Sequence, residues 1–493
     1  MHFSLDAIVA ALADAGLLVE RRGALPSSAG GITEDSRVVQ PGTLFIAVRG
    51  TERDGHDYLS GAEAAGAIAA IVENPNRCPP ELLPSIVVND GRRAAAVAAA
   101  AAYGFPARHL QLVGVTGTNG KTTTVNMLRH LLDARDLRSA SIGTLGVLVG
   151  SEGRPMDGGS GLTTPGPVEL QRVFRTLVDS GIARVAMEVS SHSLHQRRVE
   201  GVQFDVVAFT NFTRDHLDYH GTMEAYFAAK ARLVDHLLPH GTVVYNHDDT
   251  AWQALRTSRR RVSFSERLPS AEVHAEDVRF GARGSEWMLV LAEERFPVRL
   301  PLIGDFNVTN ALGAAAAAYA LGVPSTRIAA GLSSLPQVPG RLEIVHETPA
   351  VLRDYAHTPD ALERALDAVR PFARGRLIVV FGCGGDRDKG KRPVMGEIAQ
   401  RKADVAIVTS DNPRTEDPER ILDDIEAGMT GPHERIVDRH RAIERALELA
   451  DDTDVVLLAG KGHETYQVRG TTKHPFDEKI IVNELMAARQ VRR

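Results

Sequence analysis

The chain has 493 residues, of which 43% are hydrophobic and 24% are charged, and its formal net charge is −6. This length suggests about three domains, and the composition is that of an ordinary globular enzyme. The negative charge gives no electrostatic reason to expect a nucleic-acid partner, so we predict none.

The cysteines and the hydrophobic runs indicate the cellular compartment of the protein and whether it enters a membrane. Cys78 and Cys383 lie far apart in the sequence, which argues against a disulfide framework and favours a reducing compartment. The first residues include Asp6 and no long apolar core, unlike a signal peptide. The longest alanine-rich runs, 94–102 and 311–320, are too short to cross a bilayer. We predict a cytoplasmic monomer with no membrane insertion.

Residues 1–106 form the first predicted block. Short strand-like runs at 43–48, 67–72 and 85–88 are separated by Pro-Gly and Asp-Gly turns, which end strands. We therefore predict a small N-terminal α/β domain.

Residues 107–339 form a central block in which strands alternate with helices. The predicted strands are 110–115, 184–189, 205–209 and 242–245. This alternation predicts a mostly parallel sheet with helices on its faces. Each strand ends in polar residues, and ligands bind at that edge of open α/β sheets. Residues near 273–300 favour antiparallel strands, and 336–340, with two prolines and a glycine, is interpreted as a linker.

Residues 340–493 repeat the α/β pattern and predict a Rossmann-like domain. Its buried strands are 376–381, 404–408 and 454–458, and the polar segments that follow them are 382–387, 409–414 and 459–464. Polar residues at three strand ends predict a substrate pocket. The first of these loops lacks G-x-G-x-x-G, so a dinucleotide site is not favoured.

Residues 112–124 are the most informative segment of the central block. An apolar strand opens into a glycine loop that ends in Lys121 and Thr122 before a predicted helix at 122–132. This architecture wraps backbone N–H groups around a polyphosphate. It departs from the Walker A pattern, which would place a glycine where the chain has Val115. The alternative is an ordinary turn, but Gly-Lys-Thr at a helix start favours ATP, with Lys121 on the β/γ-phosphates and Thr122 on Mg²⁺.

Two further segments carry candidate metal ligands. Glu188 ends a predicted strand near this loop and could hold Mg²⁺ directly or through water, although a lone carboxylate there is often structural. Residues 211–220 contain two histidines and two aspartates. His216 and His220 have a spacing that zinc sites use, but no third soft ligand is near. We favour a second Mg²⁺ between ATP and an acidic substrate.

Three segments in this order, 117–123, 188–192 and 214–220, resemble the Mur ligase family, whose members add amino acids to UDP-N-acetylmuramoyl peptides in peptidoglycan synthesis. Residues 35–37 with 41–47 resemble the family's uridine-nucleotide domain, and 354–359 with 382–392 resemble its C-terminal domain. The resemblance therefore covers essentially the whole chain. It implies a UDP-muramoyl-substrate-binding domain (1–106), a central P-loop-type ATPase domain (107–339) and an amino-acid-binding Rossmann-like domain (340–493).

The resemblance also implies roles for individual residues. ATP would be bound by Gly117, Thr118, Asn119, Gly120, Lys121, Thr122, Thr123, Asn307, Asn310, Arg341 and Asp354. The UDP-muramoyl dipeptide would be bound by Ser36, Thr163, Thr164, Ser190, Gln196 and Arg198. Metal contacts would come from Thr122, Glu188, His216 and Lys230, and catalytic roles would fall to Lys121, Lys230 and His216.

The choice of amino acid is implied by residues 411–414, Asp-Asn-Pro-Arg. Family members that take meso-diaminopimelate carry this segment, and relatives that add lysine lack the arginine. Diaminopimelate has one carboxylate more than lysine, and a planar guanidinium can hold it with two charge-assisted hydrogen bonds. Alone, Asn-Pro-Arg would be read as a turn. The implied contacts are Arg387, Asp411, Asn412, Pro413, Arg414, Gly460 and Glu464.

Lys230 resembles the family's carbamylated lysine. The ordinary alternative is a solvated lysine on an amphipathic helix. A carbamate would turn the cation into an anion that supports the second Mg²⁺.

Taken with these residues, the resemblance implies an ATP-dependent amide ligase of cell-wall biogenesis, and so of cell shape and division. It would add meso-2,6-diaminopimelate to the D-glutamate γ-carboxylate of UDP-N-acetylmuramoyl-L-Ala-D-Glu through an acyl phosphate, with closure of its domains. One rival is folylpolyglutamate synthetase, which needs neither the N-terminal block nor Asp-Asn-Pro-Arg. The other is an ATP-driven switch, which would not require three polar strand ends.

Overall fold

The computed structural model describes residues 2–50, 53–159, 161–281 and 283–492. The chain separates into two compact units, residues 1–273 with 313–328 and residues 274–312 with 329–493, and each is described by itself. The predicted division into three domains stays a prediction. None of the helices in the described part of the chain combines the length and apolar character needed to cross a bilayer.

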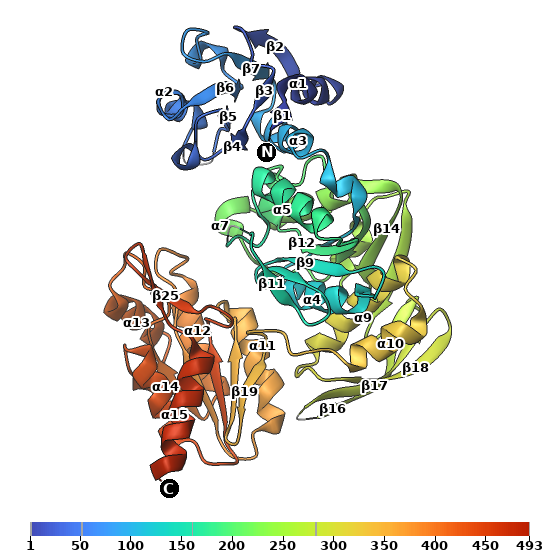
Figure 1. Ribbon diagram of the computed structural model, residues 1–493. Helices are drawn as coiled ribbons and strands as arrows, with labels where there is room; N and C mark the ends of the chain where they lie inside the picture. Colours follow the sequence, from blue (N-terminus) through green and yellow to red (C-terminus); the bar gives the residue numbers. More distant parts are fainter. Residues whose placement is uncertain (1, 51–52, 160, 282, 493) are drawn as a thin grey trace. The chain divides into compact units, whose positions relative to one another are not determined.

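The N-terminal part of the first unit is a five-stranded sheet (Figure 1). Its order is β2 (Leu18–Arg22), β7 (Ser85–Val88), β6 (Ala67–Val72), β5 (Thr43–Ile46) and β4 (Gly31–Thr33). The four strands from β4 to β7 are parallel, and β2 is antiparallel to β7. The three strands predicted here are thus present.

Helices cover both faces of this sheet because its strands are apolar on both sides. Side chains of β5 and β6 alternate between two core clusters, one packed on α1 (Leu5–Asp14) and α3 (Gly91–Ala102), the other on α2 (Leu59–Ala64). The remaining short elements are β1 (Phe3–Ser4), β3 (Ser28–Ala29), η1 (Ser36–Val38), η2 (Gly55–Tyr58), η3 (Pro75–Arg77) and η4 (Pro106–His109).

The larger sheet of the first unit is mostly parallel, as predicted. Its strands, in spatial order, are β11 (Arg154–Met156), β10 (Gly146–Val149), β9 (Ser139–Gly143), β12 (Arg184–Glu188), β8 (Gln111–Thr116), β13 (Phe204–Phe209), β14 (Leu237–Asn246) and β15 (Arg260–Ser265). The strands from β9 to β15 pair in parallel, and β10 and β11 form antiparallel pairs at the edge.

The helices of this sheet follow its strands in the chain. They are α4 (Lys121–Leu132), α5 (Pro167–Asp179), α6 (Ser191–His195), α7 (Leu217–His220), α8 (Met223–Ala231), η5 (Arg232–His236) and η6 (Thr250–Ala254). The helix α4 packs on β9 and β12, and one apolar core lies among the strands and α5. Polar segments therefore follow β8, β12 and β13 at one edge.

The second unit begins at His274, within β16 (Val273–Gly281), and continues with β17 (Gly284–Leu291) and β18 (Glu294–Leu300). β17 and β18 are antiparallel, which agrees with the prediction for 273–300. Residues of α9 (Phe306–Ala320) and α10 (Ser325–Ser333) are divided between the two units.

The C-terminal part of the second unit is the predicted Rossmann-like α/β fold. Its sheet has the order β19 (Glu343–Glu347), β20 (Ala350–Asp354), β24 (Val455–Ala459), β21 (Leu377–Phe381), β22 (Val405–Val408) and β23 (Glu434–Arg435). Only the edge strand β19 is antiparallel.

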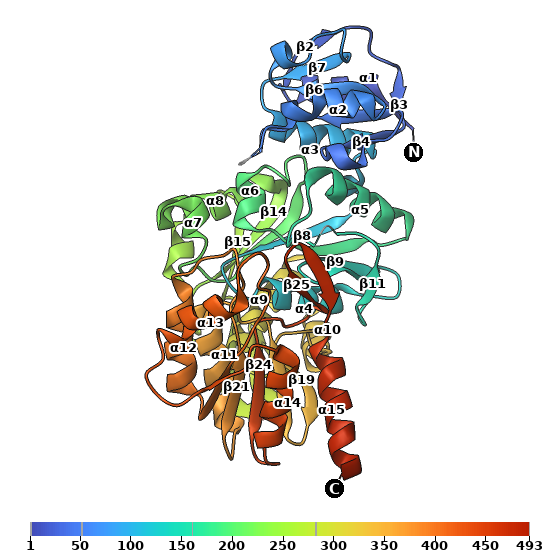
Figure 2. The same ribbon diagram turned by 90° about the vertical axis from the view of Figure 1, so that its left-hand side faces the viewer.

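Two helical layers enclose this sheet (Figure 2). One core cluster packs α11 (Pro359–Val369), α12 (Lys391–Lys402) and α13 (Pro418–Glu426) on the sheet, and the other packs α14 (Arg439–Leu449) and α15 (Glu478–Arg492). The remaining elements are η7 (Arg370–Phe372) and the hairpin of β25 (Tyr466–Arg469) and β26 (Thr472–Pro475). The polar loops after β21, β22 and β24 leave the sheet at one edge.

Candidate functional site

The glycine loop between β8 and α4 has the backbone conformation that its glycines permit. Gly117 and Gly120 have φ values of 149° and 83°, which side chains rarely adopt. A Cβ on Gly117 would lie 1.9 Å from the Thr210 Oγ1. The end of β13 holds the loop, because the Thr118 N–H donates to the Asn211 carbonyl and the Asn119 N–H to its Oδ1, both at 2.8 Å. The helix α4 therefore begins at Lys121 with its N-terminus on this loop.

Two lysines converge on this loop. Lys121 Nζ donates to the carbonyls of Gly117 (3.0 Å) and Thr118 (2.7 Å), and Lys230 Nζ donates to the same Gly117 carbonyl at 2.7 Å. Lys230 lies on α8 and is 1% exposed. Burial, reinforced by the charge of Lys121, holds the pKa of Lys230 well below its usual range. The solvated-lysine alternative for Lys230 is therefore wrong, since its side chain is enclosed.

Glu188 joins this region to the residues expected at the peptide substrate. Its buried carboxylate accepts from the Thr144 N–H at 2.8 Å and from the Thr144 Oγ1 at 3.3 Å. The hydroxyl oxygens of Thr144 and Thr163 lie 3.2 Å apart, within hydrogen-bond distance, and the Thr164 hydroxyl donates to the Glu188 carbonyl (2.8 Å). The Ser190 N–H completes the set by donating to the Thr164 Oγ1 at 3.1 Å.

Arg198 and Gln196 extend the same network. Arg198 Nη1 donates to the Thr164 carbonyl at 2.9 Å, and its Nε donates to the Gln196 Oε1 at 3.1 Å. Five of the six residues expected at the UDP-muramoyl dipeptide are thus linked. The sixth, Ser36, begins η1. Its neighbour Glu34 reaches the helix that follows Thr164, because a Cβ on Gly166 would lie 2.6 Å from the Glu34 Oε1.

Aromatic and histidine rings gather beside Lys230. His216 precedes α7 with φ 52°, and its ring centroid lies 4.7 Å from that of His192, which lies 5.5 Å from that of His220. Burial lowers the pKa of His192 and of His220 to about 4 and also lowers that of His216. These imidazoles are therefore neutral near pH 7 and can act as ligands or hydrogen-bond partners.

A ready-made metal cage is absent from the part of the chain that the structure describes, where no three His, Cys, Asp or Glu side chains are grouped to hold an ion. The absence of such a group does not favour a zinc site at His216 and His220. Mg²⁺ makes a different demand, because it keeps several waters and binds through one or two carboxylates together with substrate phosphates. The Glu188 carboxylate and the Thr122 hydroxyl fit that chemistry.

The expected amino-acid site lies at the edge of the C-terminal sheet. The Asn412 Nδ2 donates to the Glu464 Oε2 at 2.8 Å, which joins the loops after β22 and β24. Gly460 has φ 116°, and a Cβ there would lie 3.5 Å from the Asp411 Oδ2. The acidic and amide groups predicted to bind one ligand are therefore neighbours.

Lys461 is a residue of this site to which the sequence analysis gave no role. Its side chain is 0% exposed, and Nζ lies 3.2 Å from the Asn412 Oδ1, 3.2 Å from the Glu464 Oε2 and 3.6 Å from the Asp411 Oδ1. A buried ammonium thus neutralises part of the acidic cluster. In the sequence, only its position beside Gly460 in the polar segment 459–464 could have suggested that Lys461 belongs to this site.

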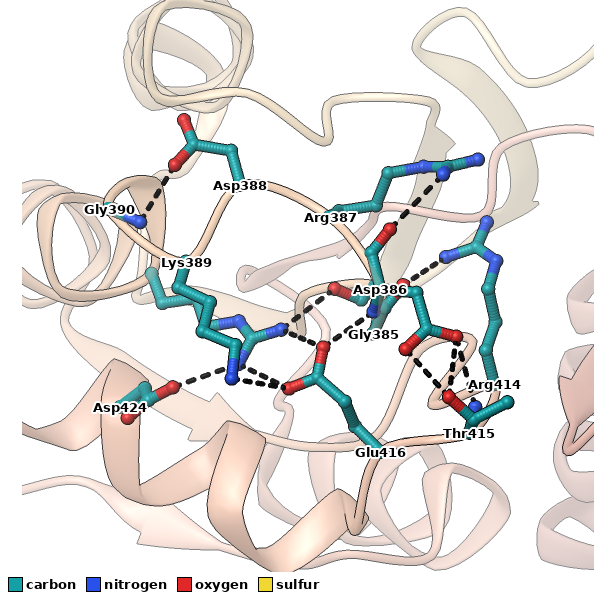
Figure 3. Close-up of polar contacts among 12 residues, drawn as sticks. Gly385, Asp386, Arg387, Asp388, Lys389, Gly390, Arg414, Thr415, Glu416 and Asp424 are labelled. Carbon is teal, nitrogen blue, oxygen red and sulfur yellow. Dashed lines mark hydrogen bonds and ion pairs between the residues drawn. The ribbon is translucent and has the colours of Figure 1, made fainter. Parts of the chain in front are cut away.

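Arg387 and Arg414 extend to the same side of their loops (Figure 3). Arg414 Nη1 donates to the Gly385 carbonyl at 2.7 Å, and Arg387 Nη1 donates to the Asp386 carbonyl at 3.2 Å. Gly384 lies between them, since a Cβ there would be 2.9 Å from the Arg414 Nη1 and 3.8 Å from the Arg387 Cγ. The Pro413 carbonyl packs on Gly385 in the same way. Two cationic forks are therefore presented together beside the acidic cluster.

Four residues predicted to bind ATP lie in the second unit. Asn310 donates to Asn307 at 3.0 Å, and Asn307 donates to the Ile303 carbonyl at 2.7 Å. The Asp354 Oδ2 accepts from the Leu342 N–H at 2.7 Å, and burial raises the pKa of Asp354 to about 6. The Arg341 guanidinium lies 4.8 Å from the Tyr355 ring centroid. Their role toward ATP stays a prediction.

These features define a class of protein: an α/β enzyme with a glycine loop of the kind that binds phosphates and, in a separate unit, a sheet edge that carries clustered charged side chains. The Mur ligase family, catalytic domain, matches residues 29–109; the Mur ligase middle domain matches 115–318; and the Mur ligase, glutamate ligase domain, matches 340–462.

Whole-length relatives agree with these domain matches. The chain is 46% identical over 492 residues to the UDP-N-acetylmuramoyl-L-alanyl-D-glutamate–2,6-diaminopimelate ligase of Synechococcus elongatus, covering 96% of this chain and 97% of that one. It is 45% identical over 469 residues to the ligase of the same name from Geobacillus kaustophilus, covering 92% and 94%. The chain belongs to the Mur ligase family.

Solved structures give the same fold. A structure of a ligase with that name is 31% identical, with a TM-score of 0.68, and the match covers 99% of this chain and 100% of that one. Mycobacterium tuberculosis folylpolyglutamate synthase complexed with ADP is 19% identical, with a TM-score of 0.64, and shares the fold over 75% of this chain and 91% of its own. The predicted α/β fold class and family are confirmed.

Proposed function

We propose that the protein is the ATP-dependent ligase that adds meso-2,6-diaminopimelate to the D-glutamate γ-carboxylate of UDP-N-acetylmuramoyl-L-Ala-D-Glu. The observation that carries the proposal is the pairing of Arg387 and Arg414 across Gly384, beside the cluster of Asp411, Asn412 and Glu464. An amino acid with a second ammonium and a second carboxylate at one end matches such a site. The relatives that bear this ligase's name support the proposal along the whole chain.

The first chemical step would occur at the phosphate loop. A γ-carboxylate oxygen of the dipeptide attacks the γ-phosphorus of ATP, the bond to the β-phosphate oxygen breaks, and ADP leaves. Lys121 would exchange its bonds to the Gly117 and Thr118 carbonyls for phosphate oxygens and offset their charge. Thr122 and Glu188 would hold Mg²⁺, which supplies further charge neutralisation when bound.

The second step would form the amide. The diaminopimelate amine attacks the acyl-phosphate carbon and loses a proton, and phosphate leaves. Arg387 and Arg414 would hold the distal carboxylate, and Asp411, Asn412 and Glu464 would hold the distal ammonium. The loop and this edge belong to different units, and closure of the domains during the reaction stays a prediction.

Lys230 is proposed to carry a carbamate. Carbamylation needs a neutral amine, which attacks the carbon of CO₂ and releases a proton. The lowered pKa of the buried Lys230 favours that neutral form. Carbamylation would also change the present arrangement, in which the side-chain nitrogens of Lys121 and Lys230 both donate to the single carbonyl of Gly117.

One assay tests the proposal. Purified protein is supplied with Mg-ATP and UDP-muramoyl dipeptide, and ADP release is followed with diaminopimelate or with lysine. We expect release that needs the dipeptide and strongly prefers diaminopimelate. Release independent of the dipeptide would instead indicate an ATP-driven switch, and equal use of lysine would refute the specificity. A cytoplasmic location and a monomeric state remain predictions.

A further inference from the structure

A buried arginine lies behind the two arginines of the amino-acid site. Arg392, on α12, is 0% exposed. Its Nη1 donates to Asp424 Oδ2 (2.8 Å) and Glu416 Oε2 (3.1 Å), and its Nη2 donates to Glu416 Oε1 (2.9 Å) and the Gly384 carbonyl (3.3 Å). Such a bidentate pair fixes both distance and orientation. With both Nη groups occupied inside the protein, Arg392 acts on the site through its neighbours.

Glu416 passes this constraint to the loop after β21 (Figure 3). Its Oε1 accepts from the Asp386 N–H at 2.5 Å, and its Oε2 lies 3.4 Å from Lys389 Nζ. Hydrogen bonds from Arg392 lower the pKa of Glu416 to about 2. The carboxylate is therefore ionised throughout the working pH range, and the link from Arg392 to the Asp386 backbone persists.

The backbone held in this way is strained. Asp386 and Arg414 have φ values of 52° and 53°, in the left-handed region that costs energy for any residue with a side chain. Such conformations persist when their surroundings over-determine them. Here a second link runs across the loops, because the Thr415 hydroxyl and N–H donate to the Asp386 carboxylate at 2.8 and 3.2 Å.

The two links tie together the loops that carry the carboxylate-binding arginines. Asp386 immediately precedes Arg387, and Thr415 and Glu416 immediately follow Arg414. The Gly385 N–H adds a direct bond between the loops by donating to the Asn412 carbonyl at 2.9 Å. A shift of the Arg392–Glu416 pair would therefore move both guanidinium groups relative to each other.

We propose that Arg392, acting through Glu416, is a positioning residue that sets the spacing of Arg387 and Arg414 and thereby the preference for an amino acid with a second carboxylate. This inference rests on the proposed function. A carboxylate can be gripped by two forks only if they are held to within a fraction of an ångström, and Arg392 supplies that support from inside the fold.

The test uses Glu416→Gln and Arg392→Lys in the full-length enzyme, with diaminopimelate varied at saturating ATP and dipeptide. We expect KM for diaminopimelate to rise about 10- to 100-fold, the scale of an ångström-sized misplacement. The kcat at saturating diaminopimelate and the KM for ATP should change less than about twofold, and the preference over lysine should fall in parallel. Melting temperatures establish that each variant is folded.

Asp424→Asn is the matched control, because Asp424 accepts from Arg392 at 2.8 Å and lies on the side away from Arg387 and Arg414 (Figure 3). It should leave KM for diaminopimelate within about threefold of wild type. A merely structural role would instead lower stability or kcat alone and leave KM for diaminopimelate unchanged. The inference is overturned if both loop-side variants keep the wild-type KM and preference while Arg414→Ala loses them. A wild-type enzyme that does not use diaminopimelate would overturn the proposed function and this inference with it.

Discussion

Replacing Arg414 by alanine isolates the recognition of the distal carboxylate. The Arg414 Nη1 is engaged by the Gly385 carbonyl at 2.7 Å, which aims the rest of the guanidinium at the ligand. Hydrogen bonds to charged groups contribute about 1.5–3 kcal/mol each. Since Arg387 remains to hold part of the charge, we expect a loss of about 3 kcal/mol, which is roughly 150-fold in kcat/KM for diaminopimelate.

The assay is steady-state ADP release with diaminopimelate or lysine varied at saturating Mg-ATP and dipeptide. Alanine accepts the left-handed φ of 53° no worse than arginine does, so the fold and the KM for ATP should be preserved. Arg414→Lys keeps the charge but loses the planar guanidinium, so its kcat/KM for diaminopimelate should lie between those of the wild type and Arg414→Ala. The weak use of lysine should not fall, because lysine lacks the carboxylate that Arg414 would bind. A wild-type kcat/KM for diaminopimelate in Arg414→Ala, or an equal fall for lysine, would refute the reasoning.

Three further predictions concern other parts of the structure. Lys230→Ala should lower kcat about 10²- to 10³-fold and regain part of it with added formate or acetate, whereas full activity without them would exclude a carbamate. Gly117→Ala should abolish binding of ATP analogues in calorimetry, because its Cβ would lie 1.9 Å from the Thr210 Oγ1; Gly16→Ala, which meets nothing within 4 Å, should bind normally. Glu416 has a lowered pKa, so its stabilisation is present above its unfolded pKa near 4.5 and disappears as the pH falls toward 2. Glu416→Gln should therefore lower the unfolding free energy by about 1 kcal/mol at pH 7 and by nearly nothing at pH 2 in denaturant titrations; an equal difference at both pH values would contradict the assignment.

The strands were predictable because buried parallel strands are continuous apolar runs. The prediction 110–115 corresponds to β8 (Gln111–Thr116), and 67–72 and 85–88 correspond to β6 and β7 without error. The prediction 242–245 captured only part of β14 (Leu237–Asn246), since the first half of that strand contains Pro239 and Gly241, which are uncommon inside strands. The edge hairpin of β10 and β11 was also missed, because glycines surround it.

The candidate site was only partly predictable, for a different reason. Lys121 and Glu188 follow apolar strands, so their place at the sheet edge can be inferred locally. Nothing local indicates that Thr144 holds the Glu188 carboxylate, or that Arg392 reaches Glu416 across 24 residues of sequence. Such partners depend on the packing of elements distant in the chain, and a basic residue on a helix usually points to solvent.

The buried ammonium of Lys461 gives the proposed amino-acid site a means of discriminating against substrates that lack a distal carboxylate. Because Lys461 already lies within 3.6 Å of both Asp411 and Glu464, its single positive charge offsets one of the two carboxylate charges of the acidic cluster. A lysine substrate would place its terminal ammonium between this cluster and the guanidinium groups of Arg387 and Arg414. It has no distal carboxylate to pair with those two cations. Its rejection would then come from repulsion between like charges as well as from a missing bond. An inhibitor for this site should accordingly be zwitterionic at its distal end, because a simple diamine would meet three fixed cations.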